Sequence, residues 1–206
     1  MTPLYSVRPP VARVAAWAWV AFTVLNLLDL GLGLTGKPVR DMTGAVMAAV
    51  LLAGCGVAYV LGLRPVIVAD EAGVTVRNPL RDIRAPWRAV RRIEAKDAIT
   101  LTFAQADGPD GSERSMRLWV LQSSPRAAAK AEARSKRDAA RLPKGAEKAL
   151  KGRTPTMFAV EQLNEIAERE RPKTDEDATT GTVRWSPVAV ASLVVPIVLL
   201  VIVSVL

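Results

Sequence analysis

Residues 43–77, TGAVMAAVLLAGCGVAYVLGLRPVIVADEAGVTVR, contain the change of pattern that decides the fold. The part before Arg64 is apolar and carries no charge. It has about the 20 residues that a helix needs to cross a hydrocarbon core of about 30 Å. After Arg64 the pattern changes to short β-branched and alternating segments separated by turn residues, which is typical of strands. The sequence therefore predicts a membrane-spanning helix followed directly by a β domain.

Two further apolar runs, 14–34 and 186–206, are also long enough to cross a bilayer. The first is longer than the apolar core of a usual signal peptide, and no clear A-x-A cleavage site follows it, so we expect a retained helix. These runs explain how a chain of 206 residues can be half hydrophobic and still have a net charge of +8. Apolar and charged residues occupy separate blocks.

Basic residues next to the three runs predict the orientation of the chain. Arg8 and Arg13 precede the first run, a long series of arginines begins at Arg64, and Arg184 precedes the third run. Lys and Arg are retained on the cytoplasmic side of a membrane. We therefore expect a multi-pass plasma membrane protein whose N-terminus and central domain are cytoplasmic and whose C-terminus faces outward.

This pattern predicts an order of segments along the chain. They are a cytoplasmic arm (1–13), a first transmembrane helix (14–34), a short outer loop (35–42), a second transmembrane helix (43–63), a β domain (64–122), a basic helix or linker (123–155), an amphipathic capping helix (156–171), an acidic linker (172–185) and a third transmembrane helix (186–206).

Small and polar residues within the helices raise questions of packing and function. Gly54, Ala58 and Gly62 are spaced by four residues, which allows another helix to approach closely, either the first helix or a helix of another protein. Pro196 lies halfway along the third helix and predicts a kink. Asp29 is either an acid near the outer interface or a functional group, and no second acid or base in the same helix supports a proton relay.

The central region predicts a small antiparallel sheet. Short β-branched or alternating segments lie between turn signals at 69–73, 78–82 and 105–114. Six or seven strands with this spacing indicate a curled or barrel-like sheet with one buried face.

Three runs in this region, GVTVRNPLR (73–81), APWRAV (85–90) and ITLTF (99–103), resemble the bacterial PH-like domains of actinobacterial membrane proteins. The type is that of the low-molecular-weight protein antigen 6 PH domain, and the resemblance covers about 64–122. It implies a PH-like split β-barrel closed by a C-terminal helix. The predicted fold class is therefore an α+β membrane protein with three transmembrane helices and such a barrel. The resemblance implies no defined ligand.

Two segments after the β domain have different characters. Residues 126–153 contain ten Lys or Arg against three acids, so they form a solvated helix or linker, a tether to anionic lipid, or a weak nucleic-acid contact. No aromatic residues are interleaved there, and we expect no specific nucleic-acid partner. Residues 156–171 carry an apolar face at helical spacing, which predicts either a capping helix for the barrel or a helix that binds in a partner's groove.

The sequence offers little material for catalysis. The chain has no histidine and one cysteine, Cys55, which excludes Ser-His-Asp and Cys-His sites. Asp107 and Asp110 lie on a Gly/Pro-containing loop and are expected to be turn residues. We predict that the protein is not an enzyme and needs neither a cofactor nor a metal.

Three functions remain open at this level. The first is a membrane-anchored adaptor whose PH-like domain binds an unknown membrane or cytoplasmic protein. The second is a reader of anionic lipid head groups, and the third is a small transport or channel subunit. The candidate residues for binding lipid or a partner are the arginines near the second helix: Arg77, Arg81, Arg84, Arg88, Arg91 and Arg92. Such residues can also serve only to fix topology.

Overall fold

The chain folds as two compact units, which are described separately. The computed structural model describes all residues except 1–2, 40, 96–97, 107–111, 123–154 and 206. One unit, the β unit, consists of Met1–Arg8, Val66–Val76 and Ile83–Val183. The other, the helix unit, consists of Pro9–Pro65, Arg77–Asp82 and Arg184–Leu206.

The helix unit contains three helices that are long and apolar enough to cross a membrane, as the sequence predicts. These spans are Pro10–Leu32, Met42–Leu63 and Pro187–Val205. The first is α1 and the third is α6, with Pro196 inside it. The second consists of α2 (Met42–Ala58) and a π-helical turn, η1 (Tyr59–Leu63), which closes where the Arg64 N–H donates to the Tyr59 carbonyl at 2.9 Å.

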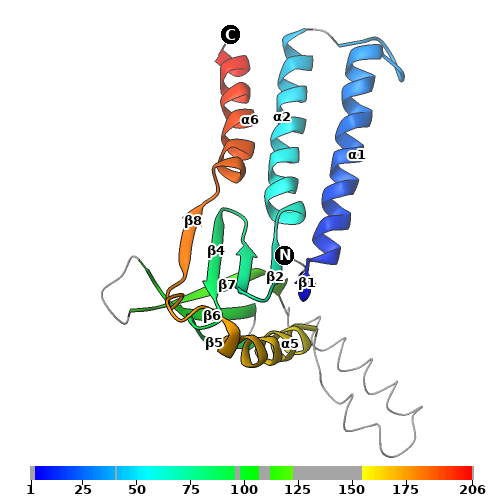
Figure 1. Cartoon of the computed structure of the whole chain (residues 1–206). Helices are drawn as coiled ribbons and strands as arrows, with labels where there is room; N and C mark the ends of the chain where they lie inside the picture. The colour runs from blue at the N-terminus through cyan, green and yellow to red at the C-terminus, as the bar shows by residue number, and fades with distance from the viewer. Residues whose placement is uncertain (1–2, 40, 96–97, 107–111, 123–154, 206) are drawn as a thin grey trace, which may run out of the picture. The chain divides into compact units, whose positions relative to one another are not determined.

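The middle helix is α2, which contacts both α1 and α6 (Figure 1). A Cβ atom at Gly56 would lie 2.0 Å from the Ser192 carbonyl oxygen of α6. One at Gly62 would lie 2.5 Å from the Ala12 carbonyl oxygen of α1, and one at Gly54 would meet the ring of Trp19. Thus α1 is the partner of the predicted Gly54–Gly62 stripe, while Gly56 allows α6 to approach on another face.

Local hydrogen bonds fix the far end of α1. Asp29 accepts two bonds from Thr35, from its N–H at 2.7 Å and from its hydroxyl at 2.8 Å. Gly33 ends the helix in the left-handed conformation and donates its N–H to the Asp29 carbonyl at 2.7 Å. The polar residue that the sequence singles out in this helix therefore orders the turn that follows it.

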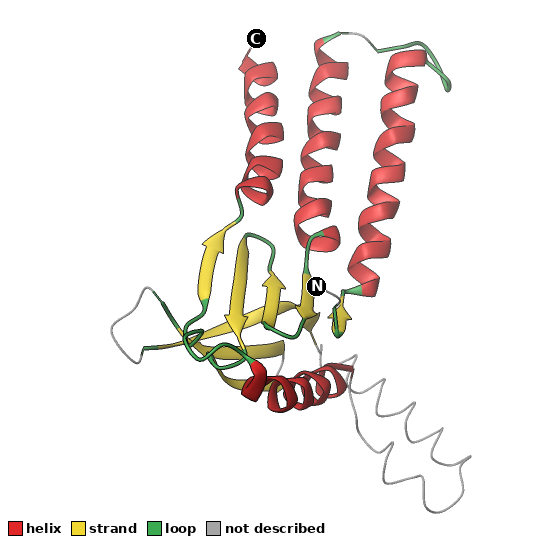
Figure 2. Cartoon of the chain, viewed as in Figure 1, coloured by secondary structure: helices red, strands yellow, loops and turns green. Residues whose placement is uncertain are grey.

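The β unit is built on two sheets (Figure 2). The five-stranded sheet has the order β1-β2-β3-β4-β8, and the three-stranded sheet has the order β5-β6-β7. Their strands are β1 (Tyr5–Val7), β2 (Val66–Ala69), β3 (Gly73–Arg77), β4 (Arg81–Pro86), β5 (Val90–Ala95), β6 (Ala98–Ala104), β7 (Glu113–Gln122) and β8 (Thr182–Trp185). The pairs β1–β2, β5–β6 and β6–β7 are antiparallel, as predicted, with a bulge between Val90 and Arg92.

Two strands lie where the sequence analysis expected none. In the segment predicted as an arm, Tyr5 pairs with Ala69 and Val7 with Ile67. The segment 172–185, predicted as a linker, ends in β8 beside β4. Both strands have only three or four residues, too few to show alternation clearly.

Helix α5 (Pro155–Glu170) covers the core of the β unit, as a capping helix should. Its face of Val160, Leu163 and Ile166 joins one cluster with the buried inward side chains of both sheets. Trp87 and Phe103 are fully buried in the same cluster. The apolar side chains that recur every 3.6 residues in the helix and every 2 residues in the strands therefore pack into one core.

Candidate functional site

The first candidate surface is the turn between β3 and β4, Arg77–Asp82, which we call the hairpin tip. It belongs to the helix unit, together with the end of η1 and the start of α6. The Asn78 N–H donates to the Arg81 carbonyl at 2.8 Å and closes the turn. The Ser186 N–H, next to the start of α6, donates to the Leu80 carbonyl at 2.9 Å. The tip is thus fixed to the start of a membrane-spanning helix.

Arg64 holds the hairpin tip from the end of η1. Its side chain is 5% exposed, and its Nη2 lies 2.7 Å from an Asp82 carboxylate oxygen. Its Nη1 donates to the carbonyls of Asn78 and Pro79. Both terminal nitrogens of the guanidinium are therefore held by the protein itself, and its role is structural.

Arg81 has a different environment. Its guanidinium lies over the ring of Trp185, 4.7 Å from the ring centroid, and the Trp185 side chain is largely exposed. Arg77 and Arg184 are exposed nearby, at the ends of β3 and β8. Among the described residues, no carboxylate pairs with any of these three arginines. The only acid of the tip, Asp82, is occupied by Arg64.

The other four candidate arginines lie in the β unit, and each has an acidic partner there. The pairs are Arg84–Asp70 at 2.8 Å, Arg88–Glu176 at 3.6 Å, Arg91–Glu113 at 4.0 Å and Arg92–Glu94 at 3.4 Å. The structure therefore does not gather the six predicted residues into one site. It separates Arg77 and Arg81 from the rest.

The Arg84–Asp70 pair also stabilises the turn between β2 and β3. One Asp70 carboxylate oxygen accepts the N–H groups of Ala72 and Gly73 at 3.0 and 2.9 Å. The Trp87 indole donates to the Asp70 carbonyl at 2.9 Å. These contacts join the turn to the core, so this pair has a structural role.

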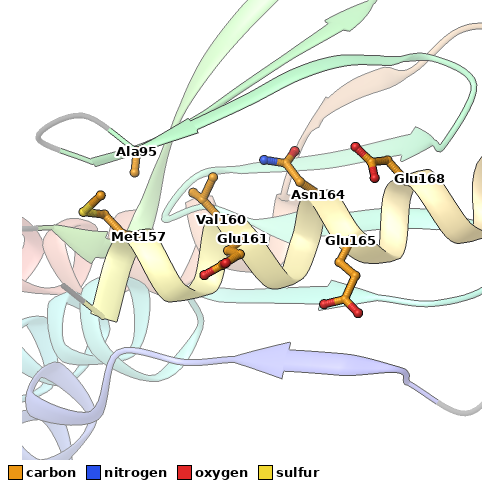
Figure 3. A pocket seen from close by; sticks show the side chains of 7 residues that line it. All are labelled: Ala95, Met157, Val160, Glu161, Asn164, Glu165 and Glu168. Carbon is orange, nitrogen blue, oxygen red and sulfur yellow. The ribbon is translucent and has the colours of Figure 1, made fainter. Parts of the chain in front are cut away.

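A second candidate surface is the groove along α5, shown in Figure 3. It is about 670 Å³ in volume and is lined by apolar, amide and acidic side chains: Ala95, Met157, Val160, Glu161, Asn164, Glu165 and Glu168. Three of the seven are carboxylates and none is basic. Met157 is 51% exposed, so the groove has an accessible apolar position beside its acidic rim.

The end of α5 holds a buried carboxylate. Glu170 has a side chain only 6% exposed and accepts hydrogen bonds from Arg169 at 2.9 Å and Lys173 at 3.1 Å. These bonds lower the pKa of Glu170 below its usual value of 4.5. The carboxylate links Arg169 near the end of α5 to Lys173, the last residue of η2 (Arg171–Lys173), and nothing in its contacts indicates chemistry.

The described residues contain no cluster of three or more His, Cys, Asp or Glu that could hold a metal ion. The basic stretch 126–153 and the loop acids Asp107 and Asp110 lie outside the described residues, so the predictions about them stay predictions.

Three residues of the hairpin tip's surroundings were missing from the predicted site. In the sequence, Arg64 and Arg184 serve only to orient the chain, and Trp185 is not among the candidate residues. The signal that could have found Trp185 is its position beside a basic residue at the start of an apolar run. The Arg64–Asp82 pairing carries no such signal, because it joins positions 18 residues apart.

Comparison with known proteins supports the PH-like assignment. A family model described as a bacterial PH domain matches residues 64–138, about a third of the chain. No curated protein and no solved structure matches significantly. The match starts at Arg64, so it includes β2–β7 and the hairpin tip.

Proposed function

We propose that this chain is a membrane-anchored adaptor whose PH-like domain binds a protein partner at the inner face of the plasma membrane. The observation that supports it best is the α5 groove, an accessible surface with apolar and acidic side chains. It lies beside the hydrophobic core of the β unit, into which the apolar face of α5 packs. Its carboxylates complement a partner segment that carries apolar and basic side chains. On this proposal the protein performs no catalysis.

The charge distribution supports the proposed orientation. At one end of the helix unit, α1 begins, η1 ends and α6 begins. This end carries Arg13, Arg64 and Arg184 as well as the arginines of the hairpin tip. The loop between α1 and α2 contains Lys37, Arg40 and Asp41. The first end has more basic residues than the α1–α2 loop, and basic residues are retained on the cytoplasmic side of a membrane, so this end is cytoplasmic on our proposal.

Two adjacent residues of α5 provide a matched test of the adaptor proposal. Met157 lines the groove and Phe158 does not, yet the two side chains are 51% and 48% exposed. A photo-crosslinking amino acid is placed at one position or the other in the full chain, in membranes of cells that make the protein. We expect an adduct of one defined mass from position 157 and none from position 158.

Charge reversal then tests the chemistry of the groove. Glu165→Lys with Glu168→Lys should abolish the adduct at position 157, because it turns attraction for a basic segment into repulsion. Equal labelling from positions 157 and 158, or an adduct that survives the charge reversal, would contradict the proposal.

A second candidate function is the reading of anionic lipid head groups. Arg77 and Arg81 at the hairpin tip favour it, since they have no carboxylate partner in the part of the chain that the structure describes and lie in the same unit as the membrane-spanning helices. Of the six arginines in the original candidate set, only Arg77 and Arg81 support this function.

A further inference from the structure

We propose that Arg77, Arg81 and Arg184, with Trp185, form a binding site for the phosphate group of an anionic phospholipid. The site rests on the second candidate function and specifies its ligand and residues. It is independent of the α5 groove, which lies in the other unit.

Strand order brings the three arginines to the same end of one sheet. β3, β4 and β8 are neighbours in the five-stranded sheet. Arg77 is the last residue of β3, Arg81 is the first of β4, and Arg184 is the penultimate residue of β8. All three belong to the helix unit. Three positive charges therefore lie at one end of one sheet.

Among the described residues, no acid pairs with these three arginines. Asp82 is the only acidic residue of the hairpin tip, and Arg64 lies 2.7 Å from it. Arg64 is also bound to two carbonyls of the tip, so it cannot turn toward a ligand. The described residues therefore supply no counter-ion for the other three arginines, whose positive charge can attract the anion of a ligand.

Stacking prepares Arg81 to bind a phosphate. A guanidinium that lies over an indole ring keeps its in-plane N–H groups free for an acceptor at its edge. The planar fork of these donors matches two oxygens of one phosphate. Trp185 thus acts as a positioning residue for Arg81 at 4.7 Å.

The neighbourhood of α6 favours a lipid over a soluble phosphate. Arg184 and Trp185 lie within three residues of Pro187, where this membrane-spanning helix begins. At 1.5 Å per residue in a helix, and about 3.3 Å in a strand, that separation places them within about 10 Å of the helix start. Tryptophan is typical of the level of the head groups, where phosphate groups are concentrated. Nucleic acid is disfavoured because Trp185 is the only aromatic side chain among these residues.

The test uses the full chain in nanodiscs of phosphatidylcholine that contain an increasing fraction of phosphatidylglycerol. Retained lipid is counted by native mass spectrometry for the wild type, for Arg77→Gln with Arg81→Gln, and for the control Arg91→Gln with Arg92→Gln. Both double variants remove two positive charges. We expect the first to lower phosphatidylglycerol retention about 25-fold, on the order of 5-fold per arginine, and the control to change it less than 2-fold.

Further arms separate the alternatives. Trp185→Ala should lower retention while Trp185→Phe keeps most of it, since an aromatic face still orients Arg81. Soluble glycerol phosphate should not compete at concentrations that match the lipid phosphate. Effective competition would assign the site to free phosphate. Equal losses of lipid retention in the two double variants would show that only the net positive charge matters. Competition by glycerol phosphate or equal losses would each overturn the proposal.

Crosslinking from position 157, measured in the same variants, distinguishes this site from the adaptor function. Loss of lipid with an unchanged adduct would confirm the lipid site without affecting the adaptor proposal. The thermal unfolding midpoint of Arg77→Gln with Arg81→Gln should stay close to that of the wild type, because neither side chain has an ionic partner among the described residues and only the stacking of Arg81 on the exposed Trp185 ring is lost. Lipid retention lost only together with folding would count against the site.

Discussion

Arginines at the hairpin tip and arginines in the β unit look alike in the sequence but differ in their partners. Arg84, Arg88, Arg91 and Arg92 each lie within 4.0 Å of a carboxylate. Arg77 and Arg81, only a few residues earlier, have no carboxylate partner among the described residues. A run of basic residues in a sequence therefore does not by itself indicate a binding surface. The arginines that form ion pairs within the folded chain must first be set aside, and only the remaining ones are candidates for binding.

Replacing Arg64 should give the largest effect, because it is the one buried arginine among the described residues of the helix unit. Arg64→Gln removes its bonds to Asp82 and to two carbonyls of the hairpin tip. We expect the free energy of unfolding to fall by about 2–4 kcal/mol. Unfolding by sodium dodecyl sulfate in mixed micelles, followed by tryptophan fluorescence, measures it.

Arg13→Gln is the control for this change. Arg13 is exposed in the same unit and has no carboxylate partner among the described residues, so its loss should leave the unfolding curve in place. Equal destabilisation by both substitutions would show that Arg64 is no different from an unpaired arginine.

The Asp70–Arg84 pair should give an intermediate effect. Asp70→Ala removes the partner of Arg84 and the acceptor for two turn N–H groups, so we expect a loss of about 1–2 kcal/mol. Thermal unfolding of the full chain, followed by circular dichroism of its strands, measures it. Glu71→Ala, one residue on and exposed, should have almost no effect; similar losses at both positions would contradict the role of the pair.

Glu170 predicts a dependence of stability on pH. Its pKa is lowered in the folded chain by hydrogen bonds from Arg169 and Lys173. The folded state then binds a proton less readily than the unfolded state, so the stabilisation is complete above pH 4.5 and is lost as the pH falls through the folded pKa. Unfolding midpoints measured on either side of pH 4.5 should show this loss. Glu170→Gln should remove this part of the dependence, and an unchanged profile would exclude it.

The smallest effect on stability is expected for two exposed arginines, one from each group. Arg92→Gln and Arg77→Gln should each change the free energy of unfolding by less than about 0.5 kcal/mol, because the exposed ion pair of Arg92 contributes little and Arg77 has no carboxylate partner among the described residues. The two variants should nevertheless differ in lipid retention, which only Arg77→Gln lowers. Retention that falls equally in both would remove the distinction between the two groups of arginines.

The sequence predicted the elements with long or strongly periodic patterns. The three membrane-spanning helices, the antiparallel sheets and the apolar face of α5 follow from hydropathy and spacing. β1 and β8 escaped because three or four residues carry too little pattern. Their presence depends on β2 and β4, which are far away in the sequence.

The candidate site was less predictable than the fold. Closeness along the chain put Arg84 and Arg88 in the same candidate set as Arg81. Their acidic partners, Asp70 and Glu176, lie 14 and 88 positions away from them in the sequence. Pairing across such separations depends on tertiary structure, which a single sequence does not reveal. The stacking of Arg81 on Trp185 was hidden for the same reason.

The close approach at Gly56 has a consequence for biosynthesis. The face of α2 that receives the Ser192 carbonyl is made about 130 residues before α6. At a synthesis rate of about 5–20 residues per second, this face waits for roughly 6–25 s without its partner helix. During that interval the nascent chain offers a glycine-lined face to lipid, to the insertion machinery or to another helix. The pairing of α2 with α6 is therefore the last step in assembling the helix unit, and it comes after the β unit has left the ribosome.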